Sequence, residues 1–406
     1  MNTQLVTRGQ KHSVMKVRNI HSTEHARALA RGRLPRLIFD FIDGAAGREV
    51  ATAHNTARFD QLRLQPRAMA DVGSRSISTH CLGKDYGVPF GIAPMGMCNL
   101  AWPKADKSIA CAAKDLNMPV CLSSAGSSTL EDMLEWAQGR AWFQLYFNHS
   151  QAQSFAAVDR AAKAGYETLV LTVDVPEVTR RVKDQINGFN VPFRMTPRAF
   201  ADFAFHPRWS LSTLANGIPQ PRNFVTANTK FDRNASRAGA DWDFLARLRD
   251  RWSGNLIVKG ITSPEDAARV KTLGINAIYV SNHGGRQLDS APAAIDILPL
   301  IRETVGAEYP LLFDSGIRNG EDVIKAFALG ADFVMLGRPV LYALAAGGQA
   351  GLMDLLQCFA QDIDLAMAQI GIRDMREANK EILFQSARPK ARADILTQTT
   401  QLKAAP

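Results

Sequence analysis

From residue 88 onward, the chain alternates short apolar runs with stretches that repeat apolar residues at helical spacing. Eight apolar runs occur in order, at 89–93, 119–122, 142–146, 168–173, 256–259, 277–281, 311–314 and 333–336. The clearest helical stretches between them are 109–116, 156–164, 264–273 and 323–329. Strands and helices that alternate eight times indicate parallel strands with crossover helices, which close into a barrel of about 250 residues. The pattern predicts an α/β protein with a (β/α)8 TIM barrel.

Three regions fall outside this alternation. Residues 1–86 are expected to form a helical N-terminal extension, which includes a helix that begins near Pro35 and ends before residue 47. The barrel is expected over 87–380, and a C-terminal tail over 381–406. The connection at 182–250, after the fourth strand, is far longer than an ordinary loop.

The long connection mixes aromatic residues with arginines: Phe189, Phe193, Phe200, Phe203, Phe205 and Trp209 with Arg194, Arg198 and Arg208. Two interpretations remain open. The segment is either a lid that packs its aromatic side chains on the barrel, or a basic and aromatic surface that contacts a membrane.

Charge and cysteine content narrow the class of protein. The net charge of +9 favours anionic small substrates or acidic surfaces, and no nucleic-acid-binding motif accompanies it. The five cysteines are widely spaced and contain no CxxC pair, so neither a disulfide framework nor a metal site is expected. The chain starts without an apolar signal core, and no run reaches the roughly 20 apolar residues of a spanning helix. We therefore expect a cytoplasmic protein, at most peripheral on the inner face of a membrane.

Every predicted strand brings small or polar residues to its carboxyl end, where barrels of this kind carry their chemistry. In strand order they are Ala93, Pro94, Met95 and Gly96; Ser123 and Ala125; Gln144 and Tyr146; Thr172 and Asp174; Lys259; Ser281, His283 and Arg286; Asp314, Gly316 and Arg318; and Gly337 and Arg338. Chance placement of the whole set is improbable, so a functional mouth is favoured.

The loop at 281–289, Ser-Asn-His-Gly-Gly-Arg-Gln-Leu-Asp, is the most informative part of this mouth. It places His283 and Arg286 three residues apart, with two glycines between them that let the backbone bend or approach a ligand. A base beside a fixed cation suits a substrate that loses a proton and carries an anion. The alternative is an ordinary surface loop, because such groupings are only probabilistic evidence of a site.

The last two strand ends favour a phosphate site. Glycine-rich loops after strands seven and eight usually form the phosphate-binding site of these barrels, and Arg318 and Arg338 lie there. Each arginine alone could instead form a structural ion pair. Earlier strand ends offer Ser123, Gln144 and Thr172 to a polar ring, and Lys259 could stabilise negative charge on it. A phosphate joined to a ring that accepts a hydride is FMN.

These motifs together resemble the FMN-dependent L-2-hydroxy-acid dehydrogenase and oxidase family. The resemblance rests on SNHGGRQLD at 281–289, WFQLY at 142–146, LTVD at 171–174, VKG at 258–260, DSGIRNG at 314–320 and LGRP at 336–339. AWPK at 101–104 and HPRW at 206–209 look most like the mandelate and lactate dehydrogenase branches.

The resemblance implies a role for each residue. The catalytic set is His283 as base, Asp174 as its partner, Tyr146 at the substrate oxygen, and Arg286 and Arg181 at the substrate carboxylate. The FMN contacts are Ala93, Pro94, Met95, Ser123, Gln144, Thr172, Lys259, Ser281, Asp314, Gly316, Arg318, Gly337 and Arg338. It also implies a homotetramer or larger assembly.

One position departs from the family. Phe41 stands where the family usually has a tyrosine that contacts the substrate carboxylate, so one charged hydrogen bond of about 1.5–3 kcal/mol is missing. Gly96 and Ala125, which line the substrate side by resemblance, are both small. We expect a pocket that accepts a larger side chain than that of glycolate.

The expected function is FMN-dependent oxidation of an L-2-hydroxy acid to the 2-oxo acid. Electrons would leave to a quinone, another carrier or O2, and an oxidase that makes H2O2 is the nearest alternative. Two functions of a different class are also weighed: a phosphate-binding isomerase or lyase in which Lys259 forms a Schiff base, and a substrate-sensing pseudoenzyme.

Overall fold

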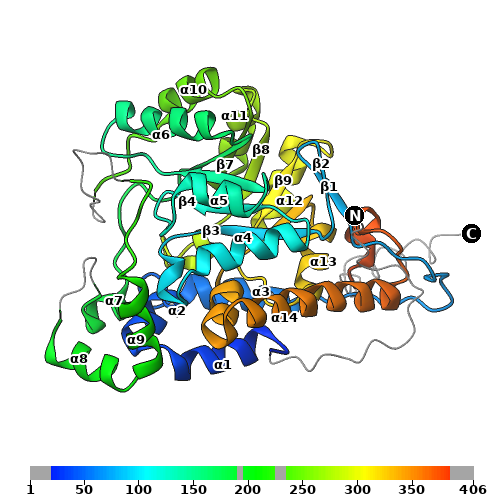
Figure 1. Cartoon of the computed structure of the whole chain (residues 1–406). Coiled ribbons are helices and arrows are strands. Elements are labelled where there is room, and N and C mark those ends of the chain that lie inside the picture. The colour runs from blue at the N-terminus through cyan, green and yellow to red at the C-terminus, as the bar shows by residue number, and fades with distance from the viewer. Residues whose placement is uncertain (1–19, 190–194, 225–234, 385–406) are drawn as a thin grey trace, which may run out of the picture.

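Eight parallel strands close into a barrel at the centre of the protein (Figure 1). This computed structural model describes residues 20–189, 195–224 and 235–384. The barrel strands are β3 (Phe90–Met95), β4 (Val120–Ser123), β5 (Ala141–Leu145), β6 (Thr168–Thr172), β7 (Asn255–Ile261), β8 (Ala277–Val280), β9 (Leu311–Phe313) and β10 (Phe333–Leu336). They pair in sequence order, and β10 closes the ring by pairing with β3. The predicted (β/α)8 barrel is confirmed.

Helices cover the outside of the barrel, one after each strand. They are α4 (Ala105–Asp115), α5 (Leu130–Trp136), α6 (Gln151–Ala164), α10 (Trp242–Arg251), α11 (Pro264–Thr272), α12 (Ala294–Val305), α13 (Gly320–Ala328) and α14 (Arg338–Ile370). Five begin at a side chain that accepts a hydrogen bond from the third helical amide: Thr129, Ser150, Asp241, Ser263 and Asn319. Such caps satisfy amides that would otherwise lack a partner, so these polar residues fix where the helices start.

A β-hairpin covers the amino-terminal end of the barrel. Its strands, β1 (Thr79–Cys81) and β2 (Lys84–Tyr86), pair antiparallel. Cys81 and Tyr86 are buried in the same apolar cluster as the barrel interior, and the Tyr86 ring lies 5.4 Å from that of Phe333. The prediction of a helical and irregular extension missed this hairpin, because three-residue strands are too short to show a period.

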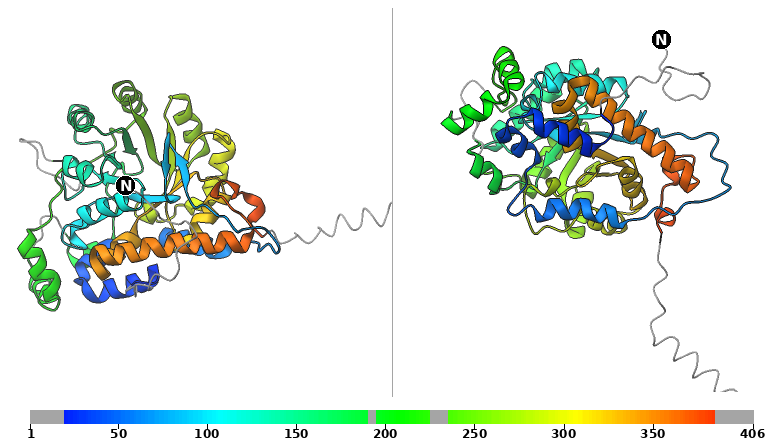
Figure 2. Two further views of the ribbon diagram at one scale, coloured as in Figure 1. Left: turned by 45° about the vertical axis from the view of Figure 1, so that its right-hand side comes forward. Right: turned by 90° about the horizontal axis from the view of Figure 1, so that it is seen from below.

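The N-terminal helices lie beside the carboxyl ends of the strands. They are α1 (Thr23–Arg33), α2 (Arg36–Asp43) and α3 (Val50–Gln61), and α1 packs along α14 (Figure 2). The Asp289 carboxylate accepts the amide protons of Arg48 and Val50 at 2.7 Å each, so the end of the 281–289 loop caps α3. This contact fixes the N-terminal extension against the mouth of the barrel.

The long connection after β6 contains three short helices, α7 (Val182–Asn187), α8 (Pro197–Ala204) and α9 (Pro207–Asn216), which project to one side (Figure 1). Phe189 and Trp209 are buried, and the Trp209 indole donates to the Leu100 carbonyl at 2.8 Å. Phe200 and Phe205, in contrast, are 65% and 84% exposed. Some aromatic residues therefore pack as a lid and others face outward, while Phe193 and Arg194 lie outside the described residues.

Candidate active site

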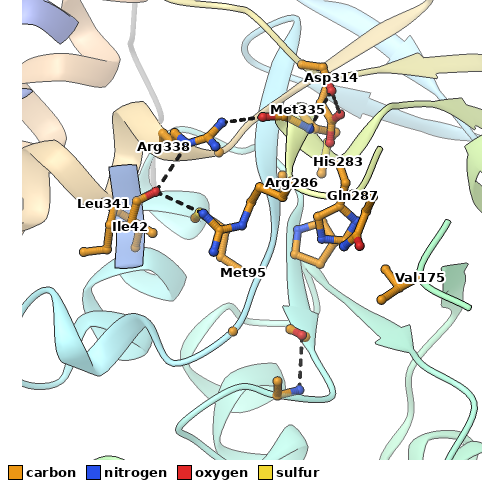
Figure 3. A pocket seen from close by; sticks show the side chains of 18 of the residues that line it. Ile42, Met95, Val175, His283, Arg286, Gln287, Asp314, Met335, Arg338 and Leu341 are labelled. Carbon is orange, nitrogen blue, oxygen red and sulfur yellow. Dashed lines mark hydrogen bonds between the residues drawn. The ribbon is translucent and has the colours of Figure 1, made fainter. Parts of the chain in front are cut away.

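A deep cavity lies at the carboxyl ends of the barrel strands (Figure 3). All eight strands or the loops that follow them contribute to its lining, and so do α2 and the long connection after β6. The cavity receives most of the predicted site residues: Phe41, Ala93, Pro94, Met95, Gly96, Ser123, Ala125, Tyr146, Arg181, Lys259, His283, Arg286, Asp314, Gly316, Arg318, Gly337 and Arg338. Residues far apart in the sequence thus meet at one mouth, because parallel strands all end on the same side.

His283 and Asp174 form a hydrogen-bonded pair at this mouth. The Nδ1 atom of His283 lies 3.0 Å from Oδ1 of Asp174, and the His283 amide donates to Ser281 Oγ at 3.0 Å. His283 has a left-handed backbone (φ 56°), which turns its side chain from β8 toward the Asp174 loop. Gly260 makes room for this pair, since a Cβ at that position would lie 2.5 Å from Cβ of Asp174.

The pKa shifts of His283 and Asp174 favour a neutral imidazole beside an ionised carboxylate. Burial lowers the pKa of His283 below its ordinary value of 6.5, despite the opposing effect of Asp174. Burial also raises the pKa of Asp174, but the hydrogen bond from His283, the charge that this histidine carries when protonated and the charge of Lys259 outweigh burial and hold that pKa below 3.8. A neutral imidazole whose cation would be stabilised by a carboxylate can accept a proton.

Tyr146 and two arginines surround the imidazole. The Tyr146 hydroxyl lies 3.5 Å from Nε2 of His283. The guanidinium carbons of Arg181 and Arg286 each lie 5.5 Å from the centre of the Phe41 ring, and Phe41 stacks on Phe189 with 4.2 Å between ring centres. The Phe41 ring therefore lies equally close to the two arginines to which the family resemblance assigns a carboxylate.

Lys259 sits in a buried polar cluster below the mouth. Its Nζ donates to Ser281 Oγ at 2.9 Å and lies 3.7 Å from Asp314 Oδ2. Asp314 also accepts hydrogen bonds from Tyr279, Ser281 and Ser315. Burial lowers the pKa of Lys259, but Asp314 and Asp174 outweigh it and raise that pKa above 10.5, so the lysine is charged.

Two buried polar atoms at neighbouring strand ends fit a polar ring. Gln144 Oε1 accepts a hydrogen bond from Ser123 Oγ at 2.8 Å, while Nε2 of Gln144 and Oγ1 of Thr172 have no hydrogen-bond partner among the described residues. An unsatisfied buried polar group costs about 1–3 kcal/mol, so such groups indicate a ligand. The flavin ring, which carries donors and acceptors along one edge, suits these atoms, and the residues therefore fit FMN.

The other side of the cavity can hold a phosphate. The backbone at residue 316 has a positive φ of 104°, which requires glycine, and a Cβ there would lie 2.6 Å from the backbone of Asn55. A Cβ at Gly337, in contrast, would have no atom within 4 Å. Arg318 lines the cavity, and burial lowers its pKa, as expected for a cation held away from water. An anion at this position would offset that cost.

Arg286 and Arg338 also make backbone contacts that the sequence did not predict. Both donate to the carbonyl oxygens of Ile42 and Gly44 at the end of α2, as Figure 3 shows for Ile42. Arg338 also donates to Gly284 at 2.8 Å. A cation stabilises the negative end of a helix dipole, so the two arginines hold α2, and Phe41 with it, over the cavity.

Further lining residues were not among the predicted site residues. Val175, Val178 and Thr179 follow directly after Asp174, whereas Phe189 and Arg237 come from the long connection. The proximity of the first three to Asp174 in sequence was a usable signal. No period or motif marked the last two.

A (β/α)8 barrel whose mouth brings together a histidine–carboxylate pair, two arginines and buried polar atoms that fit a flavin ring points to the class of flavin-dependent oxidoreductases. The model of the FMN-dependent dehydrogenase family matches residues 30–385. The chain belongs to this family, its cofactor is FMN, and it is an oxidoreductase acting on 2-hydroxy acids.

Several relatives cover nearly the whole chain. (S)-Mandelate dehydrogenase from Pseudomonas putida is 38% identical over 372 residues, 90% of this chain and 94% of that one. L-Lactate dehydrogenase from Pseudomonas syringae pv. syringae is 33% identical over 377 residues, 90% of this chain and 99% of that one. The crystal structure of the monotopic membrane protein (S)-mandelate dehydrogenase has a TM-score of 0.86 at 38% identity, and the match covers 91% of this chain and all of that one.

Proposed function

We propose that the protein oxidises an L-2-hydroxy acid to the 2-oxo acid, with His283 as the base. The observation that carries this proposal is the 3.0 Å hydrogen bond between His283 and Asp174, beside a cavity that also holds Tyr146 and two arginines. A positioned base of this kind contributes about 10²–10⁴-fold to the rate.

Each residue has one task in the reaction. Arg181 and Arg286 bind the substrate carboxylate, and the Tyr146 hydroxyl holds the oxygen on C2. Nε2 of His283 takes the proton that the substrate releases, and Asp174 stabilises the resulting imidazolium through Nδ1. FMN, when bound, supplies the acceptor for the two electrons and the second hydrogen. Lys259 provides fixed positive charge beside the ring contacts of Gln144 and Thr172, where it stabilises negative charge without reorganisation.

Anaerobic mixing with a panel of 2-hydroxy acids tests this function, because reduction bleaches the absorbance of bound FMN. His283→Gln should keep FMN and lose reduction by about 10²-fold or more. Reduction at a near-native rate in that variant would contradict the assignment of the base.

We propose that the preferred substrate has a side chain larger than that of glycolate. Gly96 and Ala125 lie against each other in the lining, where a Cβ at residue 96 would come within 3.0 Å of the Ala125 methyl group. Their small size leaves the substrate side open, and the mandelate-specific names of several relatives support the same conclusion.

We further propose that the outward face of α8 and α9 contacts a membrane and that electrons pass to a quinone there. Phe200, Phe205, Leu211 and Leu214 are each at least 65% exposed, and Arg198 and Arg208 belong to the same two helices. In the described residues, no helix is both long and apolar enough to cross a bilayer. Exposed apolar side chains beside arginines are the features of a peripheral contact.

Flotation with anionic vesicles at low salt tests the membrane contact. The native protein should float, while a variant with Phe200, Phe205 and Leu211 changed to serine should remain in solution. A native protein that stays wholly in solution would contradict the proposal. Oxygen consumption compared with reduction of an artificial quinone separates a dehydrogenase from an oxidase.

A further inference from the structure

Tyr279 places a hydroxyl group inside the barrel, in the polar cluster that surrounds Lys259. The tyrosine lies on β8, is fully buried, and shares an apolar cluster with Ile257, Leu312 and Phe333. Burial of a hydroxyl among apolar side chains is unfavourable unless the hydroxyl forms a hydrogen bond. None of the roles above uses this hydroxyl, so its hydrogen bond is the observation to explain.

The Tyr279 hydroxyl donates to Asp314, the carboxylate beside Lys259. The hydrogen bond runs to Oδ2 at 2.8 Å, and the same oxygen lies 3.7 Å from Nζ of Lys259. Burial, together with Asp314, raises the pKa of Tyr279 well above 10, so the hydroxyl keeps its proton and is the donor. The other oxygen, Oδ1, accepts from Ser281 and Ser315 at 2.5 and 2.8 Å. Tyr279 therefore supplies a donor to the carboxylate oxygen that faces the lysine.

Lys259 is close to Asp314 but is not directly hydrogen-bonded to it. Lys259 and Tyr279 are paired in the register of β7 and β8, so both side chains enter the barrel interior. Nζ of Lys259 lies 5.1 Å from the centre of the Tyr279 ring and donates to Ser281 Oγ at 2.9 Å. Its separation of 3.7 Å from Oδ2 of Asp314 is too long for a hydrogen bond. The hydroxyl and the ammonium group thus face one carboxylate oxygen, and the hydroxyl forms the direct bond.

The positive charge that Lys259 presents to the cavity depends on how strongly Asp314 neutralises it. In a buried cluster, a donated hydrogen bond polarises the carboxylate and occupies an oxygen that would otherwise attract the lysine. Without the hydroxyl, Asp314 would present more negative charge and Lys259 would move toward it. Both changes make the site less favourable for the negative charge that develops when bound FMN is reduced.

We propose that the Tyr279 hydroxyl, through Asp314, leaves the charge of Lys259 free to act on the flavin and so raises the reduction potential of bound FMN. Tyr279 is a positioning residue, since it is not among the described residues that line the cavity. This inference rests on the proposed function, which places the flavin ring beside Lys259. It deepens that function by naming a residue that sets how readily the cofactor accepts electrons.

Tyr279→Phe tests the inference in the FMN-loaded enzyme. The substitution removes the hydroxyl and keeps the ring, so the barrel interior stays filled and the ring contact with Lys259 is retained. The potential of bound FMN is measured by equilibration with a reference dye during slow anaerobic reduction. It should fall by about 30 mV, which corresponds to a tenfold change in the equilibrium constant of a two-electron reduction. The Kd of oxidised FMN should stay within about threefold of native, because the change acts on the negatively charged, reduced cofactor.

Sulfite gives a second readout that needs no 2-hydroxy acid. It adds to the ring of an oxidised flavin and leaves negative charge on it, so its affinity reports the positive charge nearby. The sulfite Kd should be about tenfold higher in Tyr279→Phe than in the native enzyme. Tyr166→Phe is the matched control, since it removes another buried hydroxyl, which donates to the Leu130 carbonyl at 2.7 Å. It should leave both the potential and the sulfite Kd unchanged.

A double-mutant comparison tests the route through Asp314. With Asp314→Asn, saturated with FMN, the carboxylate charge is absent and the hydroxyl has no charge to share. Adding Tyr279→Phe to this variant should therefore change the sulfite Kd by less than about twofold. A tenfold change in both backgrounds would show that the hydroxyl does not act through Asp314, and the inference would be wrong.

The remaining outcomes also decide the question. An unchanged potential and sulfite Kd in Tyr279→Phe would leave the tyrosine a purely structural residue. Loss of oxidised FMN from this variant would contradict the inference too, because the expected change concerns the reduced cofactor. If 2-hydroxy acids reduce FMN and the potential does not shift, only the role of Tyr279 fails. If the potential shifts and no 2-hydroxy acid reduces FMN, the proposed function fails and the role of Tyr279 stands.

Discussion

Replacing Asp174 with asparagine isolates the part of the site that stabilises a protonated histidine. The substitution keeps an oxygen near Nδ1 of His283, which lies 3.0 Å from the native carboxylate, but removes the negative charge. A hydrogen bond to a charged partner contributes about 1.5–3 kcal/mol, so FMN reduction should slow by about 10- to 100-fold. FMN binding should persist, because Asp174 faces the histidine rather than the ring cradle.

The pH dependence of kcat/KM in the same variant gives a second test of the pairing. His283 must be neutral to accept a proton, so kcat/KM falls as the pH drops through its pKa in the free enzyme. That pKa lies below 6.5, which predicts a native acid limb below pH 6.5. Asp174 raises the pKa of His283, so its loss should move the acid limb to still lower pH while the plateau falls.

Stopped-flow reduction of FMN under anaerobic conditions measures both effects. Asp184→Asn is a suitable contrast, because Asp184 pairs with Arg181 at 3.2 Å; it should raise KM and leave the acid limb in place. A plateau within about threefold of native for Asp174→Asn, with an unmoved acid limb, would refute the pairing argument.

Two further substitutions test the substrate side. Arg286→Lys should lower kcat/KM by at least about tenfold. Lysine cannot reproduce the forked guanidinium, which binds a carboxylate and also donates to the backbone carbonyls of Phe41 and Gly44. Equal rates for an α-ester and its free acid in the native enzyme would exclude a carboxylate clamp. Phe41→Tyr adds a hydroxyl to a ring that lies close to both Arg181 and Arg286, and it should narrow the advantage of larger acids over glycolate. That reasoning fails if glycolate is already the best native substrate.

Much of the barrel could be predicted because its strands are buried on both faces. Parallel strands of this kind appear as continuous apolar runs, so their number and order follow directly from the sequence. The β1–β2 hairpin could not be predicted in the same way. Its pairing depends on the barrel end that it covers, where Tyr86 meets Phe333, and not on any local pattern.

The residues of the site fall into the same two groups, those that the sequence predicts and those that it does not. Residues at strand ends, such as His283 and Lys259, could be placed because the ends of parallel strands converge. Phe189 and Arg237 could not, since the connection that carries them folds back according to tertiary contacts. The hydrogen bonds from Arg286 and Arg338 to the end of α2 could not be predicted from the sequence either, because they depend on where an N-terminal helix packs.

Two carboxylates, Asp314 and Asp174, have distinct electrostatic roles in this strongly cationic cavity. Asp314 accepts three hydroxyl hydrogen bonds and lies 3.7 Å from Lys259, so it fixes a permanent positive charge beside the ring cradle. Asp174 faces His283, whose charge changes in the proposed reaction. Lys259 lowers the pKa of both His283 and Asp174. The same lysine therefore adds to the effect of burial in keeping His283 neutral, and it helps to keep Asp174 ionised.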